Sequence, residues 1–335
     1  MKAAIVGIQG VVLLEGERRL FAAYPPAGVI LFARNIQDRA RLRVLMGDLR
    51  RVLLRGAVLM VDQEGGRVAR LRPPHWRAHP PAADIGALFA ASPAAGLRAA
   101  WLTGALIGLD CRDAGFDVAC APVLDLRYRG AHDVIGDRAY AETQDAVARL
   151  GRAVGQGLLA AGMQPVMKHA PGHGRARADS HKELPQVEGR GVEANDLDGD
   201  ILPFARNADM PWAMTAHILY TGLDPSRPAT LSPAVIGGVL RGRMGFRGVL
   251  VTDDLAMHAL TGEPCARAGA ALAAGCDIAL YCSGETAPTA ALLEACPDLA
   301  GEAAARFTRA RAMATARAMP MDAERLSAER DRLLA

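Results

Sequence analysis

The chain has 335 residues, of which 51% are hydrophobic and 22% are charged. This composition excludes intrinsic disorder and predicts a large buried core, at a length that suits one large α/β domain. Lysine and arginine total 39 against 36 aspartates and glutamates, which gives a formal charge of +3. So balanced a charge argues against nucleic acid as the main ligand.

Cysteine usage and apolar run length bear on the compartment. None of the six cysteines forms a CxxC pair, and a chain this long does not need disulfides, which favours buried thiols in a reducing environment. The start of the chain lacks the pattern of a secretion signal, and no unbroken apolar run approaches the length of about 18 residues that spans a membrane. We therefore expect a cytoplasmic protein without membrane contact, and we favour a monomer.

Short apolar segments alternate along the chain with segments of helical periodicity. Predicted strands bounded by turn residues occupy 3–8, 28–32, 57–61, 116–123, 164–168, 212–216, 248–252 and 277–282. Predicted helices between them include 40–54, 143–161, one that opens at Ser232-Pro233, 265–274 and 286–296. Strands that are apolar throughout and separated by helices indicate a parallel sheet covered on both faces.

The number and spacing of these strands predict the architecture. Eight strands over about 280 residues fit a TIM-type (β/α)8 barrel, here a single domain over residues 1–335. A doubly wound open sheet is the main alternative, but no glycine-rich phosphate turn follows any strand. We expect the segment 300–335, rich in alanine and arginine, to form peripheral helices outside the barrel.

Polar residues follow six of the predicted strands. They are Arg34-Asn35, Asp62-Gln63-Glu64, Asp125, Lys168-His169, His217 and Asp253-Asp254. The carboxyl ends of barrel strands converge on one mouth, so we expect these side chains to share a pocket. Each also has a plain structural interpretation, because aspartate caps helices and stabilises turns.

The irregular segment 170–185 is a second candidate feature, since loops of this length are typical of lids and binding loops. Asp179 precedes His181 by two residues and can hydrogen-bond one ring nitrogen, which raises the basicity of the ring. This spacing makes His181 a candidate acid/base, with an ordinary surface position as the alternative.

The Asp253-Asp254 pair and three histidines also leave alternatives open. One carboxylate of the pair could point into the mouth as a nucleophile while its neighbour caps the next helix, or both could cap. His169, His173 and His217 could bind a metal, but the chain has no HxH or HExxH pattern.

Three long motifs point to a known family. They are VDQEGGRVARLR (61–72), KHAPGHGRARADSH (168–181) and VTDDLAM (251–257). Together with GVILFARN, APVLD, VIGDRAY and AGCD, they resemble the bacterial β-N-acetylhexosaminidases of the third glycoside hydrolase family. More narrowly, they resemble its single-domain cytoplasmic enzymes of peptidoglycan recycling. The resemblance runs from about residue 28 to 285 in the family's order.

The resemblance implies a role for each matching position. Asp253 matches the nucleophile, His181 the general acid/base and Asp179 the partner of that histidine. The positions that hold the N-acetylglucosamine ring match Asp62, Arg70, Arg138, Lys168 and His169. For Arg138, a structural pairing with a carboxylate such as Asp125 is the alternative.

The implied reaction is retaining hydrolysis of terminal, non-reducing β-linked N-acetylglucosamine from muropeptides, through a covalent glycosyl-enzyme and without metal or cofactor. The segment Arg175–Ala178 is more basic than the family pattern, which bears on the preference for the leaving group.

Two other functions remain as alternatives. One is a metal-dependent barrel hydrolase that places Lys168, His169, His217 and Asp253 around an activated water. The other is a non-catalytic carbohydrate-binding barrel, which would not require a nucleophile.

Overall fold

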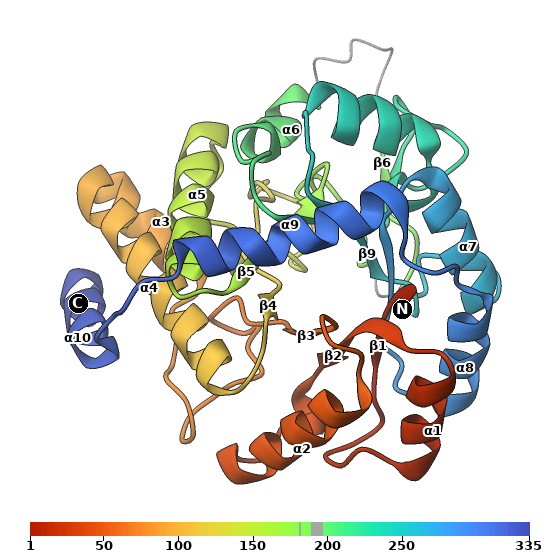
Figure 1. The fold of residues 1–335 in the computed structure, drawn as a ribbon. Coiled ribbons are helices and arrows are strands. Elements are labelled where there is room, and N and C mark those ends of the chain that lie inside the picture. The colour runs from red at the N-terminus through yellow and green to blue at the C-terminus, as the bar shows by residue number, and fades with distance from the viewer. Residues whose placement is uncertain (181, 189–196) are drawn as a thin grey trace.

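A computed structural model describes residues 1–180, 182–188 and 197–335 of the chain (Figure 1). Eight parallel strands close into a barrel in the order β1-β10-β9-β7-β5-β4-β3-β2. They are β1 (Lys2–Gly7), β2 (Pro26–Leu31), β3 (Val58–Val61), β4 (Val118–Ala119), β5 (Gln164–Ala170), β7 (Trp212–Thr215), β9 (Val249–Asp254) and β10 (Ile278–Tyr281). The predicted (β/α)8 barrel is confirmed, and the open-sheet alternative is wrong.

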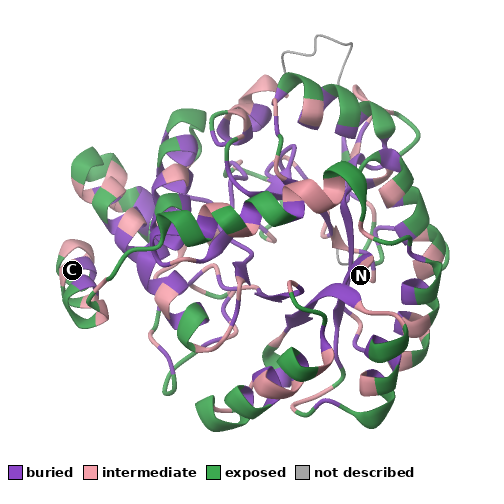
Figure 2. Cartoon of the chain, in the orientation of Figure 1, coloured by how far each residue is buried: buried purple, intermediate pink, exposed green. Residues whose placement is uncertain are grey.

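A ring of helices surrounds the barrel (Figure 1). Its members are α1 (Glu15–Ala23), α2 (Arg39–Val52), α3 (Ala82–Ala91), α4 (Pro93–Asp113), α5 (Gln144–Ala160), α6 (Asp198–Ala205), the π-helix η4 (Ala234–Arg243), α7 (Pro264–Ala274) and α8 (Thr286–Ala295). In α2, Leu42, Leu45 and Leu49 form the buried face, and the Asp38 side chain caps the helix by accepting from the amide of Arg41. Figure 2 shows the result, with buried residues on the strands and inner helix faces and exposed residues outside.

Short elements complete the chain. They are the 3-10 turns η1 (Ala33–Asn35), η2 (Gly136–Arg138) and η3 (Ala229–Leu231) and a small parallel sheet of β6 (Gln186–Val187) and β8 (Leu219–Tyr220). The strand predicted over 116–123 is regular only over the two residues of β4. Pro122 lies in that segment and has no amide hydrogen to donate to a neighbouring strand, which accounts for the early end.

The C-terminal segment forms two helices outside the strands. Helix α9 (Gly301–Arg317) crosses the N-terminal end of the barrel (Figure 1), where the ring of Phe307 meets Trp212 of β7 edge-on at 5.5 Å. Phe307 and Ala310 thereby join the cluster of apolar side chains that fills the barrel interior. Helix α10 (Ala323–Leu334) packs Leu326 against α4.

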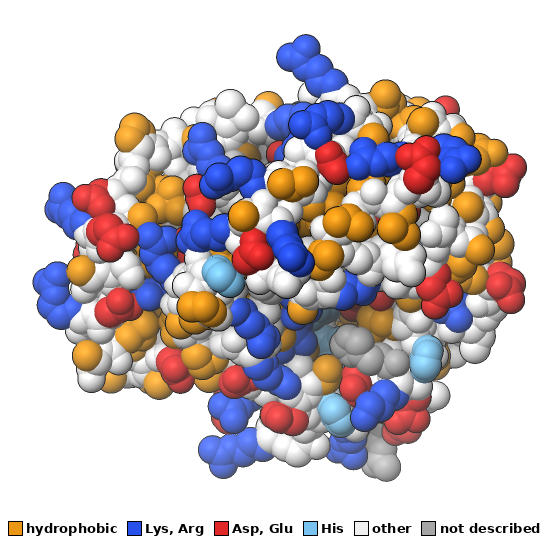
Figure 3. Space-filling model, turned by 90° about the horizontal axis from the view of Figure 1, so that it is seen from below, with side chains coloured by type: hydrophobic (Ala, Val, Ile, Leu, Met, Phe, Trp, Pro, Cys, Tyr) orange, Lys and Arg blue, Asp and Glu red, His pale blue; other side chains and the backbone are white. Residues whose placement is uncertain are grey.

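The surface carries both signs of charge. On the face in Figure 3, arginine and lysine side chains are interspersed with aspartate and glutamate, as the nearly balanced composition predicts. Across the described part of the chain, the helices are too short or too polar to cross a membrane. All six cysteines are free thiols.

Candidate active site

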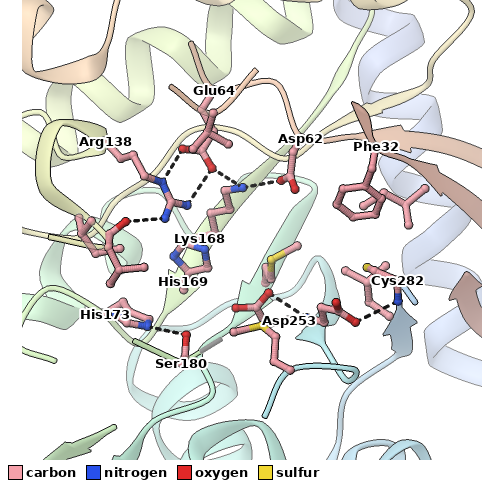
Figure 4. Close-up of a pocket in the computed structure, with 18 of the residues that line it drawn as sticks. Phe32, Asp62, Glu64, Arg138, Lys168, His169, His173, Ser180, Asp253 and Cys282 are labelled. Carbon is pink, nitrogen blue, oxygen red and sulfur yellow. Dashed lines mark hydrogen bonds and ion pairs between the residues drawn. The ribbon is translucent and has the colours of Figure 1, made fainter. Parts of the chain in front are cut away.

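A cavity of about 160 Å³ opens at the carboxyl ends of the barrel strands (Figure 4). Residues from β5 and β9 and from the segments that follow β2, β3, β4, β5 and β10 surround it. The polar and aromatic side chains that line it belong to Phe32, Asp62, Glu64, Arg70, Arg138, Lys168, His169, His173, Ser180, Asp253 and Asp254. Such a concave site with convergent polar groups is typical of ligand pockets in barrel enzymes.

Two carboxylates and three cations form an ionic network on one wall. The ammonium of Lys168, buried at the end of β5, lies 2.8 Å from Oδ1 of Asp62 and 2.6 Å from Oε1 of Glu64. Arg138 donates Nε and Nη2 to the two oxygens of Glu64, at 2.8 and 2.9 Å. Arg70 lies 3.4 Å from Asp62. The network presents charged hydrogen-bonding groups to the cavity in a fixed arrangement.

The charge state of Glu64 follows from this network. Burial alone would raise the pKa of its carboxyl, but Arg138 and Lys168 outweigh that effect and lower the pKa to about 2. Glu64 is therefore ionised at neutral pH. The Glu64 carboxylate therefore holds the side chains of Arg138 and Lys168 in place at the cavity wall.

Asp125 fixes the orientation of His169. This aspartate is fully buried, and its Oδ2 lies 2.7 Å from Nδ1 of His169, while Oδ1 accepts from the backbone amides of His169 and His173. Burial opposes ionisation of Asp125, but His169 outweighs it, so the pKa of this carboxyl is lowered. Nδ1 of His169 is thus the protonated donor, and Nε2 is left for a ligand in the cavity.

The two aspartates at the end of β9 have different surroundings. Asp254 accepts at Oδ1 from the amides of Ala256 and Cys282, both at 2.9 Å, so it ties the loop after β9 to the end of β10. Asp253 accepts one backbone bond at Oδ1 from the amide of Asp254, and among the described residues Oδ2 has no hydrogen-bond partner. Asp253 is thus the carboxylate that can act on a ligand (Figure 4).

Nearby polar groups keep Asp253 ionised. Burial would raise the pKa of this carboxyl, but the electrostatic effects of His169 and His217, the backbone amide of Asp254 and the ammonium of Lys168 together lower it. Asp254 shows the contrast, because burial raises its pKa in spite of the two amide donors. The two neighbouring carboxyl groups thus differ in the direction of their pKa shifts as well as in their hydrogen bonds.

The segment after β5 forms the opposite wall. Nε2 of His173 lies 3.1 Å from the hydroxyl of Ser180, and burial, with the charge of nearby His169, lowers the pKa of His173 to about 4. Tyr220 donates its hydroxyl to the carbonyl of Gly172 at 2.6 Å and so anchors the start of the segment. The imidazole of His173 is therefore neutral and held in the wall.

Of the predicted acid/base pair, Asp179 lies within the described residues and His181 does not. Asp179 is half-buried in this segment; its carbonyl accepts from the amides of Lys182 and Glu183, and its side chain is not part of the cavity lining that the described residues form. His181 lies outside the described residues.

The structure brings six of the predicted site residues around one cavity: Asp62, Arg70, Arg138, Lys168, His169 and Asp253. The expectation that all six strand ends share the pocket holds only in part. Arg34 and Asn35 donate to the carbonyl of Ile8, and His217 bonds to Thr230 and to the carbonyl of Asp254. These side chains satisfy buried polar groups behind the site.

Glu64 is the partner that the sequence left unassigned, and Asp125 pairs with a different residue from the one considered. Arg138 pairs with Glu64 and not with Asp125, whose carboxylate is taken by His169. A signal for Glu64 was available, because it lies two residues beyond Asp62, and alternate residues of an extended segment project to the same side.

The alternative of a metal-dependent hydrolase finds no set of metal ligands in the part of the chain that the structure describes. There, no three side chains of histidine, cysteine, aspartate or glutamate converge so as to hold a metal ion. Lys168, which that alternative placed among the ligands, is instead paired with two carboxylates.

Known proteins are similar to this chain in sequence and in fold. The family model "Glycosyl hydrolase family 3 N terminal domain" matches residues 11–313. A Bordetella parapertussis protein named Beta-hexosaminidase is 40% identical over 283 residues, which cover 83% of this chain and 79% of that protein. A protein of the same name from Aromatoleum aromaticum is 38% identical over 307 residues, covering 90% and 85%.

Solved structures give the same result. NagZ from Neisseria gonorrhoeae, in complex with N-trifluoroacetyl-D-glucosamine, superposes with a TM-score of 0.86 at 30% identity and covers 100% of this chain and 98% of its own. A family 3 β-N-acetylglucosaminidase from Paenibacillus sp. str. FPU-7 has a TM-score of 0.82 at 29% identity, covering 99% and 66%. The chain therefore belongs to glycosyl hydrolase family 3, in which it is a β-N-acetylhexosaminidase.

Proposed function

We propose that this enzyme removes terminal, non-reducing β-linked N-acetylglucosamine from peptidoglycan-derived muropeptides, with retention and through a covalent glycosyl-enzyme on Asp253. The observation that carries the proposal is the state of Asp253, a partly buried carboxylate in the cavity whose pKa is lowered and whose Oδ2 has no hydrogen-bond donor among the described residues. Retaining glycosidases need such a carboxylate to attack C1 of the sugar as the bond to the leaving oxygen breaks.

The ionic network suits recognition of the sugar ring. Asp62, Arg70, Lys168 and Arg138 offer charged donors and acceptors to hydroxyl groups, and His169 offers Nε2, which has no hydrogen-bond partner among the described residues. Because their mutual contacts already fix these groups, they need little rearrangement as charge develops at the ring in the oxocarbenium-like transition state. A solved relative, NagZ from Neisseria gonorrhoeae, is in complex with N-trifluoroacetyl-D-glucosamine, which supports a glucosamine-derived ligand here.

The proposed acid/base is His181, paired with Asp179. In the first step, the protonated imidazole gives its proton to the leaving oxygen; in the second, the neutral ring takes a proton from the water that attacks C1. An unperturbed imidazole pKa of about 6.5 suits both steps near neutral pH. In support, His181 directly follows Ser180, a residue of the cavity wall.

Trapping tests the nucleophile. Incubation with the 5-fluoro glycosyl fluoride of N-acetylglucosamine should add one glycosyl mass to the peptide that contains Asp253, and Asp253→Asn should abolish both labelling and turnover. A label on another residue, or a product of inverted configuration by proton NMR, would reject the proposed mechanism.

Leaving-group dependence tests the acid/base. Since proton donation is worth about 10²–10⁴-fold, His181→Ala should lose activity on the methylumbelliferyl and natural substrates far more than on the 2,4-dinitrophenyl glycoside, whose leaving group needs no proton. Asp179→Asn should show the same trend in weaker form. An equal loss of activity on every leaving group would exclude His181 from this role.

We also propose that the enzyme acts in the cytoplasm and as a monomer. The six cysteines are free, and five of them are buried, which suits a reducing compartment. Fractionation of cells that express the tagged chain, together with light scattering of the purified enzyme, tests both statements. Recovery outside the cytoplasm, or a mass of two chains, would reject one or the other.

A further inference from the structure

Two further cavities lie near the cavity of the candidate active site, which we call the sugar cavity. One, of about 450 Å³, shares Ile135 with the sugar cavity, and it shares the segment Tyr128–Ala131 with the other, of about 560 Å³. The shared lining places the 450 Å³ cavity between the other two, so the three cavities form a row. We call the last cavity of this row the arginine cavity, lined by Tyr128, Arg129, Gly130, Ala131, Arg175, Arg177, Gln186, Val187 and Glu188.

Two loops form the walls of this row, and close contacts hold them together. At Gly174, a Cβ atom would lie 2.1 Å from the carbonyl oxygen of Leu126, so only glycine allows this approach. The amide of His132 donates to the carbonyl of Ala176 at 3.0 Å. The loops after β4 and β5 thus meet through backbone contacts, which gives the cavity walls a fixed shape.

In the described part of the chain, the lining of the arginine cavity is positively charged. There, three arginines and one glutamate, Glu188, line it. Arg175 stacks on Tyr128, 4.8 Å from the ring centre, and forms an ion pair with buried Asp200. Its side chain therefore stabilises the cavity wall. Arg177 is exposed and, in the described part of the chain, its guanidinium makes neither an ion pair nor a hydrogen bond.

Arg129 retains most of its binding capacity as well. Its only ion pair in the described residues is with Glu142 at 3.4 Å, and the two side chains are 92% and 54% exposed. Such an exposed pair contributes little and is easily replaced by a better partner. Among the described residues of the cavity, Arg129 and Arg177 are therefore the guanidinium groups that are open to an anion.

We propose that the arginine cavity binds a carboxylate of the leaving group through Arg177 and Arg129, which makes this β-N-acetylhexosaminidase selective for anionic aglycones. Guanidinium groups favour carboxylates because two N–H groups match two oxygens. The inference rests on the proposed muropeptide substrate, whose leaving group carries carboxylates on the lactyl ether or, once a peptide is attached there, on the peptide. The arginine cavity is separated from the sugar cavity by the cavity between them, a position that suits the distant part of a leaving group.

Three substrates separate these sources. They are the neutral p-nitrophenyl N-acetylglucosaminide, the disaccharide with 1,6-anhydro-N-acetylmuramic acid, and the same disaccharide carrying the stem peptide. Arg177→Glu should lower kcat/KM for an anionic substrate by about tenfold or more, the worth of a charge-assisted hydrogen bond, and leave the neutral substrate unchanged. If Arg177→Glu lowers kcat/KM for both disaccharides, the bound group is the lactyl carboxylate in the disaccharide without a peptide and a peptide carboxylate in the disaccharide with one. If it lowers kcat/KM only for the disaccharide that carries the stem peptide, the bound group is a peptide carboxylate. Either pattern supports the proposal.

Controls make the test decisive. Arg55→Glu reverses another exposed arginine, in the segment before β3 at the opposite end of the barrel, and should change no substrate. Arg129→Gln should show the selectivity of Arg177→Glu in weaker form, and added salt should weaken the wild-type preference for anionic substrates. Equal loss of activity on all three substrates, or no loss on any, would overturn the proposal.

Failure of the proposed function gives a different pattern. In that case the wild-type enzyme cleaves the p-nitrophenyl glycoside but neither disaccharide, and the inference falls with its substrate. If only the inference is wrong, the wild-type enzyme cleaves all three, and Arg177→Glu does not discriminate between them.

Discussion

The two ends of the barrel each hold a buried carboxylate between two cations. At the C-terminal mouth, Glu64 lies 2.8 Å from Nε of Arg138 and 2.6 Å from the ammonium of Lys168. At the opposite end, Asp277, just before β10, accepts from one arginine of η4 at 2.7 Å and one of α9 at 2.8 Å. The bridging motif is the same, but the surroundings differ.

The difference lies in what adjoins each carboxylate. Glu64 and both its partners line the sugar cavity. Asp277 accepts from Arg241, Arg306 and the amide of Leu250, and so fastens η4, α9 and the start of β9 to one another. A buried ionic cluster alone therefore does not identify a site, and the adjoining cavity distinguishes binding from fastening.

The largest effect is expected at the mouth, from Glu64→Gln. Removing one partner of a buried ionic network costs about 3–5 kcal/mol because it leaves uncompensated charge. We expect the free energy of unfolding to fall by about 3 kcal/mol and kcat/KM to fall by about 100-fold, since Arg138 and Lys168 lose their anchor. Urea unfolding and steady-state kinetics on the p-nitrophenyl glycoside measure the two effects.

A matched control lies in the same loops. Arg67 and Asp137 form an ion pair at 2.7 Å in which both side chains are 44% exposed. Asp137→Asn should cost less than about 1 kcal/mol and leave kcat/KM unchanged. If Glu64→Gln behaved like this control, the ionic network would not hold the sugar-binding cations in place.

At the other end, Asp277→Asn should separate stability from catalysis. We expect a loss of about 3 kcal/mol in the free energy of unfolding, because Arg241 and Arg306 lose a buried partner. The kcat/KM of the folded enzyme should not change, since Asp277 does not line the sugar cavity. A large drop in kcat/KM, measured where the variant is fully folded, would contradict the division of roles between the two ends.

Much of the barrel was predictable because its strands are buried on both faces. Segments such as 57–61 and 248–252 are then apolar throughout, and this pattern is visible without a partner. The early end of β4 followed from Pro122 only once its hydrogen-bonding neighbours were known. The position of α9 across the barrel end was not predictable, because Phe307 and its partner Trp212 are far apart in the sequence.

The site was predictable where a strand end alone decides the placement. Lys168 and His169 follow this rule, because carboxyl ends of barrel strands converge. The pairing of Arg138 was not predictable, since loop geometry decides which of several nearby carboxylates it meets. Arg34 follows a predicted strand and was expected in the pocket, but it donates to the carbonyl of Ile8. No sequence pattern identifies that partner.

The mouth should also be the pH-sensitive end. The pKa of His173 is lowered to about 4 by burial and by His169, with Asp125 and Asp253 opposing the shift. Between that value and about 6.5, the unfolded chain binds a proton that the folded protein does not, so stability falls as the pH falls. From pH 7 to pH 5 this residue should cost about 2 kcal/mol in the free energy of unfolding.

His173→Gln isolates this contribution. His79 and His217 also have lowered pKa values, so the wild-type slope contains several residues, and the difference between wild type and variant reports His173 alone. Urea unfolding at several pH values should give a shallower acid slope for the variant. Identical slopes would mean that His173 is not held neutral.

The smallest effect is expected from Phe307→Leu at the N-terminal end. Leucine keeps most of the apolar burial but loses the edge-to-face contact with Trp212, whose ring lies 5.5 Å away at 69°. Such a contact is worth about 1 kcal/mol beyond the area that it buries. Thermal unfolding should therefore show a modest loss of stability without a change in kcat/KM, while Met319→Leu, at a side chain that is 53% exposed, should show neither. A drop in kcat/KM for Phe307→Leu would show that the covered end is coupled to the mouth, because the substitution leaves every side chain of the cavity in place.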